Sequence, residues 1–319
     1  MKLFIGLALS AAAALATAQE YPSRPIRILV PFAPGGVVDT STRILTQKMT
    51  ERLHWSFVIE NRPGGNGFIA TTAVAKSPAD GYTLLMAHTG EFAVNPALFR
   101  EVPYELERDF VAITMVSDAP MLYLAKAAAP FNSFQELVAV AKAKPGTVTF
   151  SSAGNGSINH LAGEWLAVAA GIKLQHVPYK GGAPAAQAVG AGDVDFGVMG
   201  VPGAAPFLKS GRGKVIGITT ARKSPLDPSW ATPRDAGIPD LDASIWVGLF
   251  APKGAPQAVV DKLNGEVRKT LADPDVQKRF VESGGAEAVG MSPSEFLARI
   301  KQDAERYGRV VKAAAVKAE

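Results

Sequence analysis

Short apolar runs alternate with amphipathic stretches along almost the whole chain of 319 residues. The apolar runs have the length of β-strands, and the amphipathic stretches repeat at helical spacing. Strands that alternate with helices predict an α/β fold, with parallel βαβ units and helices covering both faces of each sheet. We expect strands at 26–31, 57–60, 83–87, 121–125, 147–151, 174–178, 196–199, 214–219 and 247–251.

Several predicted helices carry their own boundary signals. Ser133 and Ser292 are each followed by a glutamate at the spacing of a capping box. The helix after Ser292 has proline at its first position. Another short helix is expected to begin at Asp273-Pro274 and to end at Gly284-Gly285. In the helix that follows Pro256, one buried stripe is expected. Its members are Val259, Val260, Leu263, Val267 and Leu271.

Two glycine-bearing loops connect a predicted strand to a predicted helix. The first covers 31–36 and leads into a helix over 37–52; the second covers 151–157 and leads into a helix over 158–170. Glycine lets the backbone approach a ligand closely, and the start of a helix presents free N–H groups with a partial positive charge. Such a helix start binds anions, and in parallel sheets ligands lie beyond the carboxyl ends of the strands. The pair therefore predicts a cleft that holds one anion from both sides.

The domain organisation follows from the same pattern. Residues 147–219 make a compact run of βαβ units by themselves, which predicts a second domain inserted within the first. We expect residues 19–120 and 244–319 to form lobe 1 and residues 121–243 to form lobe 2. The hinges are expected near 116–123 and 243–247.

The first residues match a secretion signal. Met1 and Lys2 are followed by an apolar run over 3–15 and by the small residues of 16–18. The apolar run is shorter than the roughly 20 residues of a membrane span. We expect cleavage after Ala18 and a mature protein outside the cytoplasm, with a retained anchor as the alternative.

Composition excludes several kinds of chemistry. The chain has no cysteine, so it can form no disulfide and no thiolate site, and its 4 histidines are too dispersed for a metal site. The net charge of +4 comes without a dense basic run, so no nucleic-acid partner is expected. Nucleophile elbows, Ser-x-x-Lys pairs, zinc-protease motifs and phosphate loops are absent from the sequence. We expect no cofactor, no metal and no enzymatic activity, with a secreted hydrolase or lyase acting on a small carboxylate as the alternative.

A set of short motifs carries a resemblance to a known family. The motifs are 31–36 with Asp39 and Arg43, then 60–65, 80–85, 151–157 with 160–164, 177–181 and 192–195. In this order they resemble the receptors of the tripartite tricarboxylate transporter family, also called Bug proteins, over essentially the whole mature chain. The sequence departs from the usual family pattern at Thr42, Asn66 and Gln187.

The resemblance implies a fold and a set of partners. The fold is that of a two-lobed periplasmic binding protein of type II, a venus-flytrap in which each lobe has a mixed, mostly parallel sheet flanked by helices. Its ligand is a small carboxylate, which is a di- or tricarboxylate, an acidic amino acid or an aromatic carboxylate, held by the two glycine loops. The partners are membrane transporter subunits or a sensor kinase, and we expect a monomer in the periplasm.

The predicted ligand-binding residues belong to the two loops and to their expected surroundings. They are Phe32, Pro34, Gly35, Gly36, Asp39, His88, Thr89, Ser152, Ala153, Gly154, Asn155, Gly156, Ser157, Tyr179 and Trp246. Neither loop contains Lys or Arg, so no arginine clamp is expected within them. Backbone amides, the hydroxyls of Ser152 and Ser157, helix dipoles and water are expected to hold the carboxylate.

Some of these residues have a structural alternative. Asp39 either stabilises the first turn of its helix or accepts from a water or a ligand ammonium group. Phe32 is either core or cleft lining, whereas His88 and Thr89 follow a strand and are expected to meet the distal end of the ligand. His160, on the helix after the second loop, is expected to be a packing or surface residue.

Overall fold

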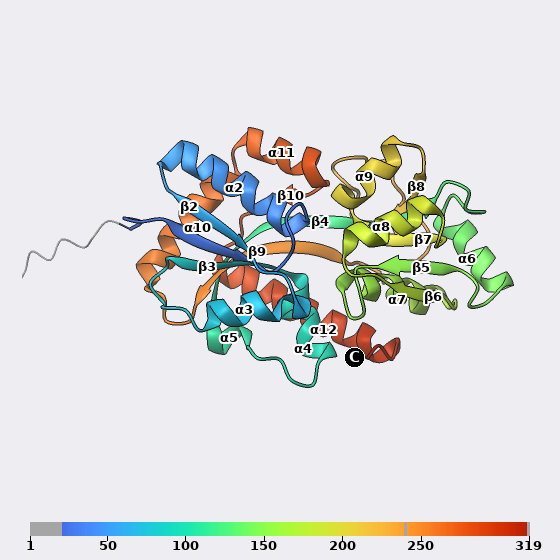
Figure 1. Ribbon diagram of the computed structural model, residues 1–319, viewed down its shortest axis with the longest axis horizontal. Helices are drawn as coiled ribbons and strands as arrows, with labels where there is room; N and C mark the ends of the chain where they lie inside the picture. Colours follow the sequence, from blue (N-terminus) through green and yellow to red (C-terminus); the bar gives the residue numbers. More distant parts are fainter. Residues whose placement is uncertain (1–20, 239–240, 318–319) are drawn as a thin grey trace, which may run out of the picture.

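The computed structural model describes residues 21–238 and 241–317. The predicted signal peptide and its cleavage after Ala18 lie outside the described residues. Two lobes lie side by side and are joined by long strands (Figure 1). This arrangement confirms the predicted two-lobed α/β fold.

The strands follow one path through both lobes, in the order β2-β1-β3-β9-β4-β7-β5-β6, and β10 and β8 also pair with β4. Their bounds are β1 Ile26–Val30, β2 Phe57–Asn61, β3 Thr83–His88, β4 Phe110–Lys126, β5 Thr149–Ser152, β6 Gln175–Pro178, β7 Phe196–Gly200, β8 Gly213–Ile218, β9 Ser244–Pro252 and β10 Glu287–Ala288. Strands β1, β2 and β3 pair in parallel, as do β5, β6 and β7. Because β4 and β9 pair with their neighbours antiparallel, each lobe has a mixed sheet.

The long strand β4 joins the lobes. Residues 110–120 pair with β9, and residues 121–125 pair with β7. The proposed lobe boundaries, at 121 and 243, fall at this change of partner, and we keep them as our proposal. The first half of β4 was not expected to be a strand. Its side chains are buried on both faces, so its sequence lacks the alternation that marks a half-exposed strand.

Helices cover both faces of each sheet. Their bounds are α2 Val37–Leu53, α3 Phe68–Ala75, α4 Asn95–Leu98, α5 Leu106–Asp109, α6 Phe134–Ala143, α7 Ile158–Ala170, α8 Gly182–Ala191, α9 Val201–Lys209, α10 Gln257–Leu271, α11 Pro274–Gly284 and α12 Pro293–Ala313. In lobe 1, α2, α10 and α11 share one apolar core, whereas α3 and α12 pack into another. In lobe 2, α8 and α9 pack together in a third core, and α6 and α7 join the core of α12.

The helix ends agree largely with the boundary signals. Ser292 forms the complete capping box, Asp273 caps α11, and Gly285 ends α11 in a left-handed conformation. Ser133 accepts from the N–H of Glu136, but the carboxylate of Glu136 accepts from Asn132, so this box is only half formed. The stripe on α10 is buried except at its first residue, Val259.

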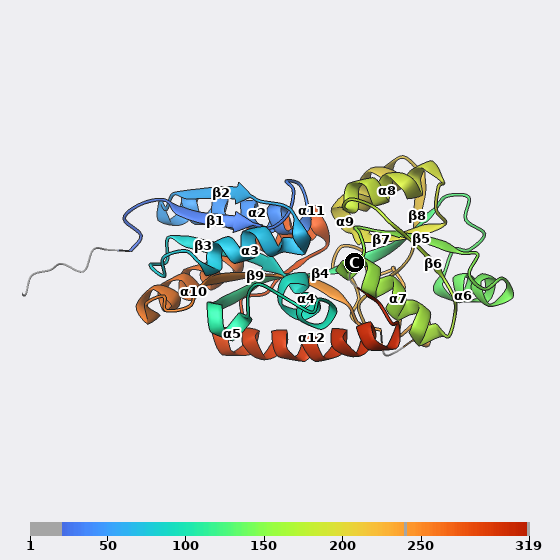
Figure 2. The same cartoon turned by 60° about the horizontal axis from the view of Figure 1, so that its bottom comes forward.

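Helix α12 extends beneath both lobes (Figure 2). Near its carboxyl end, the ring of Tyr307 meets the ring of Trp165 on α7 edge-on, with centroids 5.9 Å apart. The carboxyl-terminal helix of lobe 1 therefore packs directly on lobe 2.

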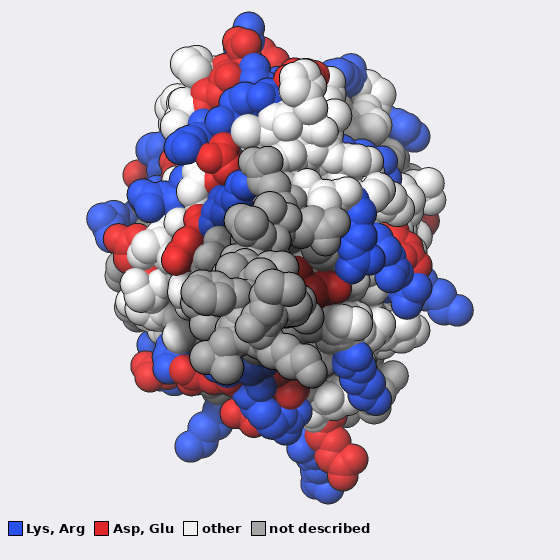
Figure 3. All heavy atoms as spheres, turned by 90° about the vertical axis from the view of Figure 1, so that its left-hand side faces the viewer, with Lys and Arg blue, Asp and Glu red and all other residues white. Residues whose placement is uncertain are grey.

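Charged side chains are mixed in sign on the end of lobe 1 that faces away from lobe 2 (Figure 3). Within 21–238 and 241–317, the structure contains no helix with the length and apolar character needed to cross a membrane.

Candidate functional site

The first glycine loop joins β1 to α2 at an exposed edge of lobe 1. Gly35 has a φ of 84°, and Gly36 caps α2 without any side-chain hydrogen bond to the first amides. The residues from Pro34 to Gly36 are exposed. The positive end of α2 is therefore open, as an anion site requires.

Asp39 holds this loop in place. Its side chain is buried, with 2% of the residue exposed. One carboxylate oxygen accepts from the Gly35 N–H and from Arg43, both at 2.9 Å, and the other accepts from Asn61 at 3.0 Å. Burial raises the pKa of Asp39, but the hydrogen bonds from Arg43, Gly35 and Asn61 outweigh it and lower this pKa below its ordinary value.

Replacing Asp39 by asparagine should lower the free energy of unfolding by about 1.5 kcal/mol, because charge-assisted hydrogen bonds are lost in a buried place. Urea denaturation measures this change. The order in which the protein prefers its ligands should stay the same, since both oxygens already have protein partners. The exposed Asp193→Asn serves as the control and should behave as wild type. If Asp39→Asn changed the order of ligand affinities and the control did not, Asp39 would be a ligand-binding residue.

The second glycine loop joins β5 to α7 in lobe 2. Gly154 and Gly156 both have positive φ, at 131° and 71°. Ser157 caps α7 by accepting from the N–H of His160 and donates to the Gly154 carbonyl at 2.7 Å. The hydroxyl of Ser152 also bonds within the loop, to the backbone of Gly154. Both hydroxyls thus shape the loop. The N–H groups of Gly154, Gly156 and Ser157 also donate within the protein.

Two histidines lie stacked beside this loop. The imidazole rings of His160 and His176 have centroids 3.7 Å apart and planes 10° apart. The Gly156 N–H donates to Nδ1 of His160 at 3.1 Å, and Nε2 of His176 lies 2.6 Å from the Ser152 hydroxyl. Burial, together with the nearby His160, lowers the pKa of His176 to about 3.

The stack was not foreseen for His176, which carries no motif of its own. The position of His176 follows from the register between β5 and β6. This register pairs His176 with Phe150, and Phe150 comes two residues before Ser152 of the second glycine loop. Register between two short strands does not follow from the sequence alone.

The two lobes are in contact beside each glycine loop. A β-carbon at Gly156 would collide with Leu98 of lobe 1 and would lie 3.7 Å from the Asn66 amide. Likewise, a β-carbon at Gly200, at the end of β7, would lie 2.9 Å from Val37 at the start of α2. Asn66, Leu98 and Gly200 were not among the predicted site residues. They belong to a conformation in which the lobes are in contact.

The remaining predicted residues fall into two groups. Phe32 and His88 lie together, with ring centroids 4.3 Å apart, and Nδ1 of His88 lies 2.7 Å from the buried carboxylate of Glu91. Tyr179 is half-buried, and its carbonyl faces Gly154. These three residues border the loops.

Thr89 and Trp246 have other roles. Both are fully buried. The hydroxyl of Thr89 donates to the Ser244 carbonyl and accepts from the Trp246 N–H, and the indole of Trp246 donates to Asp303 at 3.0 Å. Their polar groups tie β3, β9 and α12 together, so we leave both residues out of the site we propose below.

The two glycine loops present backbone groups and no Lys or Arg side chain. Within the described part of the chain, no cluster of three or more His, Asp or Glu side chains has a metal-binding arrangement. The open end of α2 and the loop before α7 come from different lobes and lie next to the interlobe contacts. Such an arrangement suits a small anion better than a large polymer.

Residues 41–316 match the family model described as the tripartite tricarboxylate transporter family receptor. The chain belongs to this receptor family. Three solved structures resemble it closely. Rpa4515 of R. palustris with adipate has a TM-score of 0.87 and 30% identity, covering 93% of this chain and 99% of that chain. The periplasmic binding protein BugD has a TM-score of 0.82 and 34% identity, covering 94% of this chain and 100% of that chain. MatC of Rhodopseudomonas palustris with bound malate has a TM-score of 0.81 and 31% identity, covering 91% of this chain and 100% of that chain.

The predicted resemblance is therefore confirmed. This tripartite tricarboxylate transporter receptor is a solute-binding protein by family, and its family is not an enzyme class. Two of the similar structures hold small dicarboxylates, adipate and malate.

Proposed function

We propose that this receptor captures a small carboxylate between its two glycine loops in the periplasm. It then delivers the ligand to membrane transporter subunits or to a sensor kinase, and it acts as a monomer after removal of residues 1–18. The first loop, Pro34–Gly36, offers the N–H of Gly36, and the second loop, Ala153–Ser157, offers the N–H groups of Ala153 and Asn155, because the other N–H groups of these loops donate within the protein. These amides, with bridging water, hold one carboxylate group.

One observation carries this proposal. The open start of α2 in lobe 1 and the loop before α7 in lobe 2 lie beside the places where the lobes come together, at Val37 with Gly200 and at Leu98 with Gly156. A ligand bound there contacts both lobes only when they are close. Better contacts in the closed form shift the balance between open and closed protein, and the closed form is what a membrane partner recognises.

The ligand class is a dicarboxylate or another small acid with a polar distal end. The adipate and malate of two similar structures support this class. Phe32 belongs to the first loop and His88 packs against it, and in our proposal these two side chains meet the distal end of the ligand. Because Glu91 lies against Nδ1 of His88, the other ring nitrogen is the one available for a ligand.

A thermal-shift screen against small carboxylates and their matching amides tests the proposal. A ligand at about 100 times its dissociation constant adds about 2.7 kcal/mol to the stability of the folded protein. The melting temperature should therefore rise by about 3 °C for the correct acid and should not change for its amide.

Adipate, malate and succinate are the first acids to test, each beside its diamide. An equal rise in melting temperature for an acid and its amide would contradict binding through the carboxylate group. No shift from any acid, with a properly folded protein, would mean that the glycine loops are structural turns only.

A further inference from the structure

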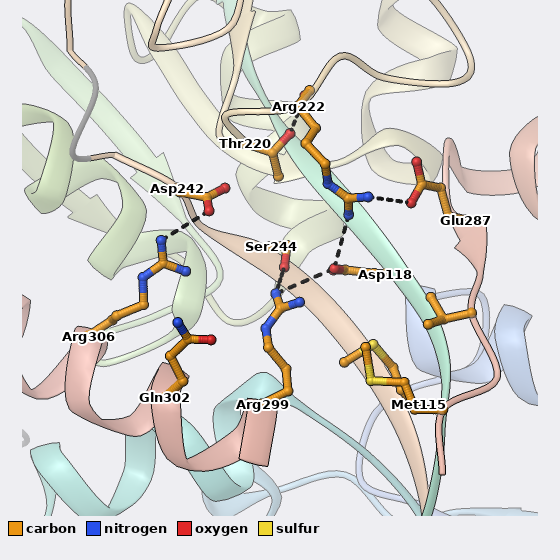
Figure 4. Close-up of a pocket in the computed structure, with 12 residues that line it drawn as sticks. Met115, Asp118, Thr220, Arg222, Asp242, Ser244, Glu287, Arg299, Gln302 and Arg306 are labelled. Atoms are coloured by element: carbon orange, nitrogen blue, oxygen red, sulfur yellow. Dashed lines mark hydrogen bonds and ion pairs between the residues drawn. The ribbon is translucent and has the colours of Figure 1, made fainter. Parts of the chain in front are cut away.

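Four carboxylic side chains are buried in the part of the chain that the structure describes, and three of them pair with arginine. The pairs are Asp39 with Arg43, Asp118 with Arg222 and Arg299, and Asp303 with Arg299 and Arg306. Figure 4 shows the guanidinium groups of Arg222 and Arg299 directed at Asp118. An ionised carboxylate in a protein interior needs such a cation, because water no longer stabilises its charge.

Glu91 is the fourth buried carboxylic side chain, and its one ion-pair partner among the described residues is a histidine. Its Oε2 lies 2.7 Å from Nδ1 of His88 and accepts from the backbone N–H of His88 at 2.8 Å. Its other oxygen is buried and has no hydrogen-bond partner within 21–238 and 241–317. We refer to His88 and Glu91 as the His–Glu pair.

Two glycines make room for the His–Glu pair. A β-carbon on Gly67 would collide with the carboxylate of Glu91, and a β-carbon on Gly90 would collide with the ring of His88. The ring also packs against Phe32 of the first glycine loop, with centroids 4.3 Å apart, and 14% of the His88 side chain stays exposed. Packing therefore holds both side chains in one arrangement and leaves the imidazole at the edge of the first loop.

The short contact within the His–Glu pair contains a proton. Two lone pairs 2.7 Å apart would repel, so either Nδ1 donates to the carboxylate or the carboxylic acid donates to Nδ1. The Gly90 N–H also points at Nδ1, from 3.0 Å, which is compatible with the second form. In both forms a further proton on Nε2 makes the pair neutral overall. Without that proton the pair carries an uncompensated negative charge in a buried place, which is costly, so the pair favours the state with Nε2–H.

The elements around the His–Glu pair bring no second charge to the ring. Strand β9 places Val247 opposite His88, and the carboxylate of Asp39, behind the first loop, has protein partners of its own. The hydroxyl of Tyr104 donates to the carbonyl of Glu91 at 2.9 Å. Burial, and then the charge of Glu91, raises the pKa of Tyr104, which therefore stays a neutral phenol.

We propose that the His–Glu pair selects an acid whose distal end is a second carboxylate. This inference rests on the function proposed above and narrows the class of its ligand. Nε2–H of His88 donates to the distal carboxylate. Glu91 does not touch the ligand; it is a positioning residue that keeps the ring oriented and protonated.

The same arrangement discriminates against a distal ammonium group. An ammonium group has only donors, so it would meet the Nε2–H donor without forming a hydrogen bond and would still lose its hydration. An alkyl end would leave Nε2–H without an acceptor. An ω-amino acid and a monoacid of the same length should therefore both bind less tightly than the diacid.

Isothermal titration at about pH 7.5 with length-matched acids tests the proposal. One series is succinate, 4-aminobutyrate and butyrate, and the other is adipate, 6-aminohexanoate and hexanoate. In a series whose diacid binds, the diacid should bind at least about 10-fold more tightly than the other two acids, which corresponds to one charge-assisted hydrogen bond. Equal affinities for the diacid and the ω-amino acid would overturn the proposal.

Glu91→Gln removes the charge of Glu91 and keeps its shape. The amide oxygen takes the place of Oε2, because the backbone N–H of His88 needs an acceptor there. This oxygen holds no proton, so Nδ1 keeps one, and Nε2 loses the negative charge that favours its own proton. The preference for the diacid over the ω-amino acid should fall by at least about 10-fold at about pH 7.5 and should return at about pH 5.5.

His88→Gln separates the role of the ring from that of its partner. An amide both donates and accepts and does not titrate, so the preference should be lost at both pH values. The exposed Glu282→Gln and His54→Gln are the matched controls and should keep the wild-type preference. A Glu91→Gln variant that keeps the preference at about pH 7.5, or does not regain it at about pH 5.5, would contradict the role of Glu91. If Glu91→Gln does not fold, the wild type and His88→Gln decide the matter.

Failure of this inference is distinguishable from failure of the proposed function. If diacids raise the melting temperature and their diamides do not, but His88→Gln keeps the preference for the diacid, the inference alone is wrong. If no acid binds, the proposed function is wrong and the inference falls with it.

Discussion

Valine in place of Gly154 should weaken the binding of carboxylates by about 100-fold, which corresponds to about 2.7 kcal/mol. Gly154 has a φ of 131°, where a β-branched residue is strained by about 1–3 kcal/mol. A β-carbon there would also lie 3.3 Å from the backbone carbonyl of Tyr179, which cannot rotate away as a side chain could. The loop must therefore change shape, and its amides no longer point at the ligand. Titration calorimetry with the acid found in the thermal-shift screen measures the loss.

Gly146 offers a matched control for this substitution. It also lies in lobe 2 with a positive φ, of 76°, but it is exposed and a β-carbon there would meet nothing within 4 Å. Gly146→Val should thus cost stability without changing affinity. If both variants lose affinity equally, the loss reflects general strain, and the second glycine loop is not part of the site.

The second prediction with a large effect concerns the stability of the folded protein at low pH. Burial and the nearby His160 lower the pKa of His176 to about 3 in the folded protein, against about 6.5 in the unfolded chain. Between these two values the unfolded chain binds a proton that the folded protein does not. Stability should therefore decrease as the pH falls from about 6.5 towards 3. Since the ring is only half-buried, we expect this histidine to account for about 2 kcal/mol of the loss, less than the full shift would give.

Urea denaturation at a series of pH values measures the effect. His176→Gln removes the titrating ring and keeps a group that can bond to the Ser152 hydroxyl, so its stability should fall less steeply below pH 6.5. His54→Gln, at the exposed end of α2, is the matched control and should follow the wild-type curve. Parallel curves for wild type and His176→Gln would mean that His176 does not supply the acid sensitivity.

Much of the architecture could be predicted because its signals are local. The glycine loops, the cap at Ser292 and the buried stripe of α10 each depend on residues close together in the chain. Residues 110–120 were missed because a strand buried on both faces has no alternation to reveal it.

The site was predicted less completely, because its details depend on distant residues. Asp39 is held by Asn61, and the second loop is supported by His176, which lies on another strand. In the sequence, Thr89 follows one predicted strand and Trp246 lies at the start of another, so both were expected at the cleft. In the structure, the side chain of Thr89 points to Ser244 and that of Trp246 points to α12. The contacts of Gly156 with Leu98 depend on how the lobes come together, for which no local signal exists.

The insertion of lobe 2 between β4 and β9 also constrains how the chain can fold. Pro120 pairs with Ser244, so the first contact between these strands closes a loop that contains the whole of lobe 2. Long loops are costly to close and slow the formation of the contacts beyond them. A compact lobe 2 holds its two ends together and removes most of this cost. A nascent chain that stops before Ser244 leaves the edges of β3 and β4 unpaired, so lobe 1 completes its sheet only after lobe 2 has been synthesised.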